Sequence, residues 1–257
     1  MSTTPQAPAP VSDETIVLRD NFVPDGATVP AGNGWTWIAE AWGLFRKAAG
    51  TWIAMVVVVF VIFAALAFIP VLGSLAGVVL GPVFTAGLVM AARTLEQGGE
   101  AQFGQLFGGF RHRFGVLAAV GAIYLVATVA IVFIVSLASG VGLLTLVGVE
   151  RPQDPAALGV TIAIAVLLIA ALMLPLLMAV WFAPPLVAFN EMGAFEAMKQ
   201  SFMGCLKNLM PFLLYGVILL VASIVATMPL MLGWLVLGPV FAASIYTAYR
   251  DIYFRRS

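Results

Sequence analysis

Long apolar stretches without charge alternate with short charged segments along residues 35–257, and this pattern predicts membrane-spanning helices. Asp, Glu, Lys, Arg and His are missing between four pairs of residues: Lys47 and Arg93, Arg113 and Glu150, Asp154 and Glu191, and Lys207 and Arg250. A membrane helix needs about 20 residues. The first and last stretches are therefore long enough for two helices and a turn, and each middle stretch holds one long helix.

Turn-forming residues divide the long stretches. Proline and glycine occur together at 70–74 and at 229–233, near the centres of the first and last stretches, and the polar segment 150–155 separates the two middle ones. We therefore expect an all-α, polytopic membrane bundle of six helices in three hairpins. The predicted spans are 51–69, 74–93, 115–138, 158–182, 209–228 and 233–250.

The N-terminal residues 1–34 break this pattern. They contain scattered prolines among polar residues and little apolar clustering, which predicts a disordered tail ahead of a membrane domain over 35–257. A secretory signal needs a basic start and an apolar run of about 7–15 residues, and residues 1–21 supply neither. The tail is therefore expected to remain in the cytoplasm.

Basic residues fall almost entirely on one side of the predicted membrane. Of the 12 Lys and Arg residues, all but Arg151 lie at the termini or in the two connections between hairpins. The positive-inside rule then places both termini in the cytoplasm and the hairpin tips outside. Because the net charge is zero, no basic field points to nucleic acid as a partner.

A short motif repeats along the chain. The segment 79–84 (VLGPVF) recurs at 236–241, and 181–186 (WFAPPL) occupies the corresponding place in the middle hairpin. We predict three repeat units, over about 35–94, 101–190 and 194–254. The small residue and the proline of each motif would bend a helix for packing, or alternatively expose a carbonyl to a ligand: Gly81 and Pro82, Ala183 and Pro184, Gly238 and Pro239. The repetition itself either builds a stable bundle or forms a central cavity or gate.

Each unit begins with apolar residues at helical spacing, which predicts an amphipathic helix at the headgroup level. The three sets are Trp35, Ile38, Trp42 and Phe45, then Phe103, Phe107, Phe110 and Phe114, and finally Phe195, Met198, Phe202 and Leu206. Basic neighbours of these sets are the candidate contacts for anionic lipid headgroups on the cytoplasmic face: Arg46, Lys47, Arg111, His112, Arg113, Lys199 and Lys207.

Catalytic and metal-binding residues are scarce. His112 has no second histidine as company, and the single cysteine, Cys205, allows no intrachain disulfide. The apolar stretches also lack the ionisable residues of coupled transporters and intramembrane enzymes. We therefore expect no cofactor and no enzymatic activity. A structural, assembly, or lipid- or partner-binding membrane protein is favoured, with a membrane protein as a possible partner; a passive transporter or channel through a central cavity is the alternative.

The repeated unit, the Gly-Pro motifs and the closing segment 246–251 (YTAYRD) together carry a resemblance over about residues 35–254. The chain resembles uncharacterised six-span proteins of the bacterial inner membrane, distantly similar to YciC-like proteins and to the membrane domain of glycerophosphodiester phosphodiesterases. The resemblance implies a location in the inner membrane. It implies no activity, because the metal-binding acids of the phosphodiesterase domain have no counterpart here.

Overall fold

The computed structural model describes residues 21–139 and 155–254, and within these ranges every regular element is a helix. The long helices come in three consecutive pairs: α3 (Ala49–Ala67) with α4 (Leu72–Glu96), α6 (Phe114–Ala138) with α8 (Pro155–Trp181), and α11 (Leu209–Thr227) with α12 (Trp234–Tyr253). Shorter segments precede or follow them: α2 (Asn33–Lys47), η1 (Phe103–Phe107), α5 (Gly108–Arg111), α9 (Ala183–Asn190) and α10 (Ala194–Lys207). The predicted all-α class is confirmed.

Five of the predicted spans coincide with helical segments that are long and apolar enough to cross a membrane: α3, α4, α6, α11 and the stretch 158–190, which covers most of α8 and all of α9. The sixth predicted span, α12, is not among the candidates. Its last turns carry Arg250 and Asp251 and several tyrosines, which lower its mean hydropathy. Most of its residues are buried inside the protein.

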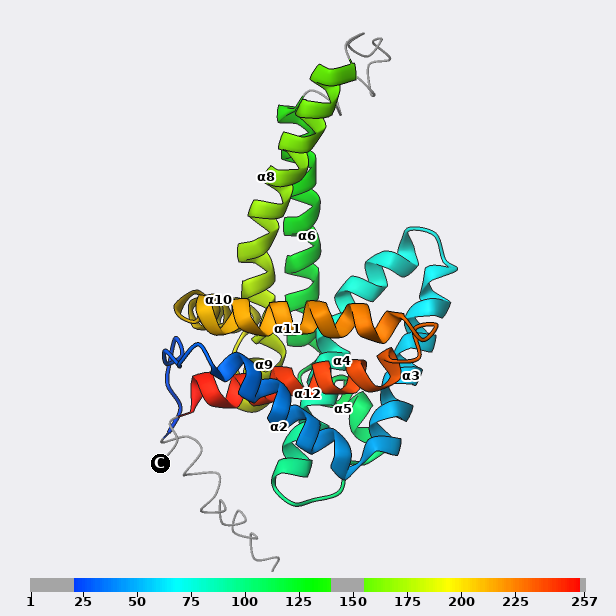
Figure 1. Cartoon of the computed structure of the whole chain (residues 1–257), viewed down its shortest axis with the longest axis vertical. Helices are drawn as coiled ribbons and strands as arrows, with labels where there is room; N and C mark the ends of the chain where they lie inside the picture. The colour runs from blue at the N-terminus through cyan, green and yellow to red at the C-terminus, as the bar shows by residue number, and fades with distance from the viewer. Residues whose placement is uncertain (1–20, 140–154, 255–257) are drawn as a thin grey trace, which may run out of the picture.

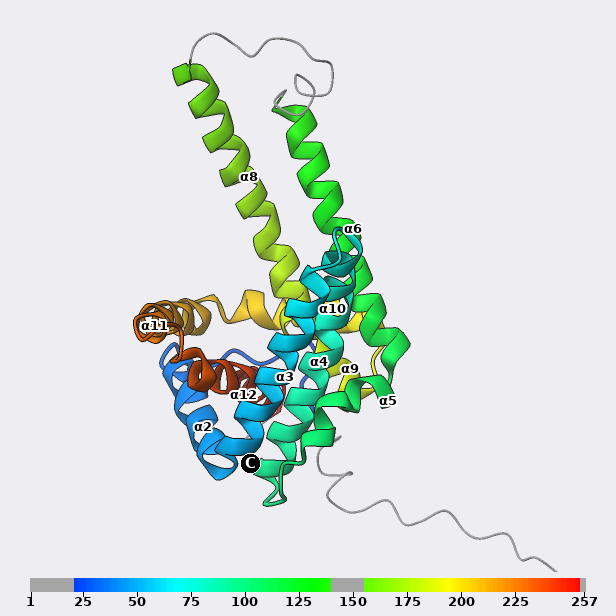
Figure 2. The same cartoon turned by 90° about the vertical axis from the view of Figure 1, so that its right-hand side faces the viewer.

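The three helix pairs point in different directions. In Figure 1, α6 and α8 project away from the rest of the molecule, whereas α11 and α12 run across their direction. The view in Figure 2 agrees, because there α11 is seen nearly along its axis while α6 and α8 remain extended. The predicted bundle of three hairpins implies that they stand side by side in one direction. The structure shows that they do not.

Each short segment that precedes a helix pair packs on the second helix of another pair. The segment α2 packs on α12, η1 and α5 pack on α4, and α10 packs on α8 and α9. One side-chain hydrogen bond illustrates each contact: Thr247 Oγ1 to the Trp37 carbonyl (2.8 Å), Gln105 Nε2 to Thr94 Oγ1 (2.7 Å), and Ser201 Oγ to the Met178 carbonyl (2.6 Å). These contacts join the pairs in a cycle: the segment before the second pair packs on the first pair, the segment before the third pair packs on the second, and the segment before the first pair packs on the third.

α2 packs on the protein mainly with residues outside the predicted apolar stripe. Trp35 and Trp42 are 59% and 43% exposed, whereas Trp37, Ala41 and Leu44 are buried. The buried stripe contains a small residue that lets α12 approach closely, and the large tryptophans of the predicted stripe remain on the surface. The exposed Trp35 and Trp42 are available for the predicted contact with lipid headgroups, which stays a prediction.

The other two aromatic segments show the same division in part. On α10, Phe195 and Leu206 are exposed while the smaller Ala197 and Ser201 are buried. In the middle segment the predicted single amphipathic helix is not present, because Phe103 and Phe107 lie on η1, Phe110 on α5 and Phe114 at the start of α6. The rings still form a row, with centroids 6.2, 6.2 and 5.6 Å apart. Their location at headgroup level stays a prediction.

The segment 21–32 is fixed against α10 and α12. The backbone N–H groups of Val23 and Ala27 donate to carbonyls of α12 at 2.8 Å each. Asn208 accepts a hydrogen bond from the Val29 N–H at 2.8 Å and donates to the Ala27 carbonyl at 2.8 Å. The predicted disorder over 1–34 was therefore wrong for residues 21–34, which these bonds and the first turn of α2 hold in place; residues 1–20 lie outside the described ranges.

The proline motifs occupy related places in the second helix of each pair. Pro82 and Pro239 are buried inside α4 and α12, whereas Pro184 is in the first turn of α9, just after α8 ends. The first and third motifs therefore lie within continuous helices, and the second marks a break. Whether these motifs serve packing or expose a carbonyl to a ligand stays a prediction.

Candidate functional site

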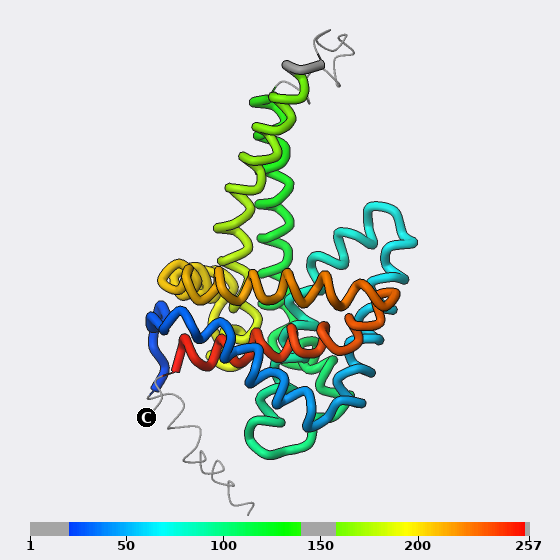
Figure 3. The backbone as a smooth tube through the Cα atoms, viewed as in Figure 1, coloured from blue at the N-terminus to red at the C-terminus, as the bar shows by residue number. Residues whose placement is uncertain are grey.

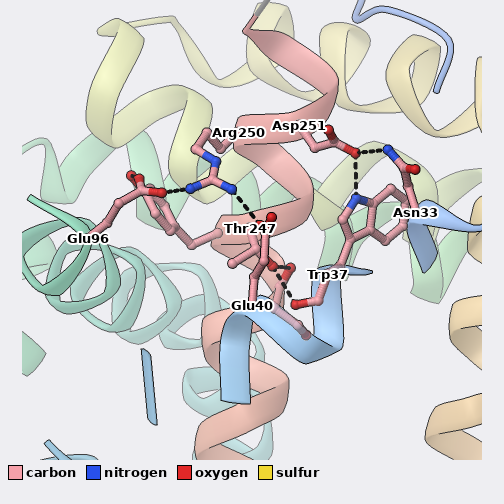
Figure 4. A network of polar contacts seen from close by, with 9 residues as sticks. Asn33, Trp37, Glu40, Glu96, Thr247, Arg250 and Asp251 are labelled. Carbon is pink, nitrogen blue, oxygen red and sulfur yellow. Dashed lines mark hydrogen bonds and ion pairs between the residues drawn. The ribbon is translucent and has the colours of Figure 1, made fainter. Parts of the chain in front are cut away.

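A network of polar side chains joins α2, α4 and α12 on one side of the helical body. We call it the polar junction, and it comprises Asn33, Trp37, Glu40, Glu96, Thr247, Arg250 and Asp251 (Figure 4). Its residues come from the start and middle of α2, the last residue of α4 and the last turns of α12.

Asp251 fixes the start of α2 on α12. Its Oδ2 accepts hydrogen bonds from Asn33 Nδ2 at 2.7 Å and from Trp37 Nε1 at 2.8 Å (Figure 4). The Asp251 residue is only 7% exposed. A buried carboxylate is costly unless hydrogen bonds satisfy it, and these two donors supply part of that compensation.

Arg250 connects two carboxylates from different helices. Its guanidinium pairs with Glu40 of α2 and with Glu96 of α4, and the side chains of the three residues are 32%, 32% and 26% exposed. Tyr246, one turn earlier on α12, donates its hydroxyl to Glu96 as well. A guanidinium offers five donors in a planar fork, so one arginine can hold both carboxylates together. The middle of α2 and the C-terminal ends of α4 and α12 are thereby tied at one point.

Aromatic rings fill the space between α9 and α12 next to the junction. Tyr249 is 2% exposed, contacts the ring of Phe189 and donates its hydroxyl to Asn190. The guanidinium carbon of Arg93 lies 4.8 Å from the centroid of the Phe189 ring, which is a cation–π contact. The second helix of the first pair, the second helix of the last pair and α9 therefore meet in a packed aromatic and polar centre.

A pocket of about 570 Å³ lies beside the junction. Charged residues of both signs line it, namely Glu40, Arg46, Lys47, Glu96 and Arg250. The ammonium group of Lys47 also donates to the Leu95 carbonyl at 3.1 Å. The acids of this pocket are already paired with Arg250, so its remaining charge comes from the exposed Arg46 and from Lys47.

The predicted headgroup contacts lie on several different elements. Arg46 and Lys47 end α2, while Lys199 and Lys207 lie on α10, and all four are exposed. Lys207 donates to the Gly26 carbonyl at 3.2 Å. The two lysines of α10 and the two cations that end α2 therefore lie on different helices.

The remaining cationic candidates follow or end α5. Arg111 and His112 are exposed. Arg113 is partly buried and donates to the carbonyls of Glu191 and Met192 at 2.7 and 2.8 Å, so it has a structural role. Lipid contact by any of the predicted cations stays a prediction.

Sequence reasoning missed the polar junction, although one signal for it was present. Arg93 follows Gly81 at the same spacing at which Arg250 follows Gly238, so the two arginines occupy equivalent positions of the predicted repeat. Both reach the packed centre, one over an aromatic ring and the other between two carboxylates. The acids that pair with Arg250 showed no spacing that would have predicted their partner.

The chemistry available at the junction is ion pairing and hydrogen bonding between helices. Within residues 21–139 and 155–254, no group of three or more His, Cys, Asp and Glu residues is arranged to hold a metal ion. The side chains of the junction are occupied with one another, and the arrangement serves to hold α2, α4 and α12 in fixed positions.

A probable inner membrane protein of Burkholderia thailandensis is similar to this chain over nearly its whole length. The two are 26% identical over 249 residues, which cover 88% of this chain and 92% of the relative. Together with five helical segments of membrane-spanning length and composition, this likeness decides the class. The chain is an integral, multi-pass membrane protein. No family model and no solved structure matches this membrane protein, so the resemblance to YciC-like proteins stays a prediction.

Proposed function

We propose that this membrane protein is a non-enzymatic structural or assembly protein of the bacterial inner membrane, which contacts anionic phospholipids with its exposed cations. The observation that carries the proposal is the packed centre, where Arg250, Glu96 and Tyr249 tie the second helices of two pairs to α2 and α9. Such a centre is suited to holding a fixed shape. It gives less support to the alternative, a passive transporter or channel through a central cavity.

The cyclic packing supports the proposed threefold repeat. The short segment before each helix pair packs on the second helix of the preceding pair. The segment before the first pair, α2, packs on α12 of the third pair and so closes the ring. A closed ring of three units has no free end, so every unit is stabilised by two neighbours. The polar junction is the part of this ring that connects the first and third units.

The topology of the proposal has six spans, with α12 covered by α2, α3, α4 and α11. Because α11 and α12 run across the direction of α6 and α8 (Figure 1), six spans require these two pairs to be tilted differently from the bilayer normal. A helix surrounded by protein need not be as apolar as one that faces lipid. Six spans place both termini on one side, and the concentration of Lys and Arg there makes that side cytoplasmic. Reporter fusions after Gly73 and Gly233 should both read periplasmic, and a fusion at the C-terminus should read cytoplasmic. A periplasmic C-terminus would reduce the spans to five, and a cytoplasmic reading at Gly233 would mean that α11 does not cross.

Lipid analysis tests the functional part. The full chain is extracted in lipid nanodiscs, and the co-purified phospholipids are compared with those of the bulk membrane. Anionic phospholipid should be enriched, and the enrichment should fall in the double variant Arg111→Gln with Lys199→Gln, because each surface cation contributes about 1 kcal/mol to anionic lipid attraction. Lipid of bulk composition, or a specific solute that co-purifies instead, would contradict the proposal.

A further inference from the structure

An apolar groove of about 870 Å³ lies between α2, α11 and α12. Figure 3 shows that α2 and α11 lie close together at one end and diverge toward the other, with α12 between them. At the closed end, the Pro211 carbonyl oxygen is only 2.3 Å from where a Cβ of Gly34 would be. The groove therefore has a tight apex and widens toward the C-terminal end of α2.

We expect the walls of the groove to face the hydrocarbon of the bilayer. α11 is one of the candidate spans, and its Val217 and Val221 line the groove while remaining more than half exposed. Trp35 and Trp42 of α2 line the opposite wall. Tryptophan is enriched where membrane interior and headgroups meet, so α2 lies along the boundary that a phospholipid crosses.

A cation follows the tryptophans on the same stripe of α2. Trp35, Trp42 and Arg46 are separated by seven and four residues in the sequence, which places them on one face of the helix. Arg46 is exposed and lies one turn beyond Trp42, the last groove residue of α2, where it lines the neighbouring charged pocket. An apolar channel that ends at a cation is complementary to a molecule with an apolar chain and an anionic head.

We infer that this groove binds one anionic phospholipid, with an acyl chain between α2 and α11 and the phosphate at Arg46. The volume falls within the range of about 300–1,000 Å³ that is usual for ligand pockets. The inference rests on the proposed function and sharpens it, because it assigns the lipid contact to one groove and to one of the seven candidate cations.

Filling the groove tests the acyl chain. Ala222 of α11 lines the groove, and Ala222→Phe should occupy part of its volume. Ala170→Phe, at an exposed position of α8 outside the groove, is the matched control. Loss of contact for two methylene groups corresponds to about tenfold weaker retention. Native mass spectrometry of the full chain with dioleoyl phosphatidylglycerol should show this loss for Ala222→Phe alone. Equal retention by both variants, each checked for unchanged thermal unfolding, would overturn the inference.

Removing the cation tests the headgroup and does not depend on the packing of α11. Arg46→Gln should reduce the preference of the one groove-bound lipid for phosphatidylglycerol over phosphatidylcholine about fivefold, whereas Arg111→Gln should leave this one bound lipid unchanged and lower only the general enrichment of anionic lipid. Equal losses in the two variants would keep the general lipid contact of the proposed function and overturn the groove as its site. Retention of a partner's helix in the groove, without lipid, would also overturn it.

Discussion

The helices α8 and α12 are both the second of a pair, yet they are surrounded by opposite environments. The 18-residue window of the span that includes α8 has no buried residue, and α8 projects from the body beside α6 (Figure 1). α12 is buried over most of its length by α2, α3, α4 and α11. The helix with the more apolar sequence is therefore the one that the protein leaves uncovered.

This inversion follows from the solvent. In water, burial in protein removes apolar side chains from an unfavourable environment, but in a bilayer the lipid tails are as apolar as the side chains. Hydropathy then selects residues for contact with lipid, and packing between helices selects for shape, small residues and hydrogen bonds. Among the five candidate spans, α4 has the lowest mean hydropathy and the largest buried share, which agrees with this account.

The largest predicted effect comes from placing a charge on the uncovered hairpin. Leu167 of α8 is 69% exposed. If its surroundings are lipid, Leu167→Arg should shift the apparent free energy of membrane insertion by about 3 kcal/mol against insertion. The measurement is the inserted fraction of the chain in microsomes or inverted vesicles.

Leu206→Arg is the control for this charge. Leu206 is also exposed, but it lies on α10 beside Lys207 and outside the candidate spans, so insertion should change little. Normal insertion of Leu167→Arg would mean that water or a polar partner covers α8, and the contrast with α12 would lose its basis.

The second effect concerns the covered part of the molecule, where two glycines of α4 can be compared. A Cβ on Gly87 would lie 2.1 Å from the Leu106 carbonyl oxygen, whereas open space surrounds the corresponding point at Gly81. Gly87→Ala should therefore separate η1 from α4 and lower the free energy of unfolding by about 1–3 kcal/mol. Gly81→Ala should change it by less than about 0.5 kcal/mol.

Thermal unfolding of both variants in the same detergent measures this difference. Equal stability of Gly81→Ala and Gly87→Ala would show that η1 does not rest on α4. Loss of stability in Gly81→Ala alone would assign the repeated Gly-Pro motif a role that the open space around Gly81 does not explain.

The sequence was sufficient for the helices that face lipid. The uncharged stretch after Arg113, for example, predicted a span at 115–138, and α6 extends over 114–138. This succeeded because lipid contact depends on composition, which a sequence displays directly. The residue at which the ordered chain begins could not be predicted from the sequence, because residues 21–32 are held by hydrogen bonds to Tyr253, Ile252 and Asn208, which are far away in the chain.

The contacts between helices inside the protein could not be predicted from composition. The face of α2 that packs on α12 contains Ala41 and Trp37, and no spacing in the sequence set it apart from the stripe of Trp35 and Trp42 that was predicted to meet headgroups. The ion pairs of Arg250 were missed for another reason. Glu40 is 210 positions away from it in the chain, and a fold is needed to bring them together.

The third effect tests whether the polar junction fixes α12 to its neighbours. Arg250→Gln leaves Glu40 and Glu96 close together without their shared cation. Because the three side chains are partly exposed, the expected loss is about 1 kcal/mol in the free energy of unfolding. Adding Glu40→Gln should recover part of this loss, since it removes one of the two like charges.

A double-mutant cycle of Arg250→Gln and Glu40→Gln measures the coupling, and thermal unfolding of the four proteins in one buffer provides the energies. High salt should weaken the coupling, because screening acts on partly exposed pairs. Strictly additive losses would show that Arg250 acts through packing alone and would remove the junction from the account of how α12 is held.

The smallest effect concerns Cys205, on the face of α10 that packs on α8 and α9. The residue is 2% exposed, and burial raises the pKa of its thiol well above the usual range, with an opposing smaller effect from the Ser201 hydroxyl. A raised pKa means that folding favours the neutral thiol. Its contribution is therefore complete below the unfolded pKa of about 8.5 and is lost as the pH rises above that value. Between pH 8 and pH 9 wild type should lose about 0.7 kcal/mol more stability than Cys205→Ala.

The thiol should also resist iodoacetamide until the chain unfolds; fast labelling of the folded protein would show that α10 separates readily from α8, and the covered part of the molecule would be smaller than the packing indicates.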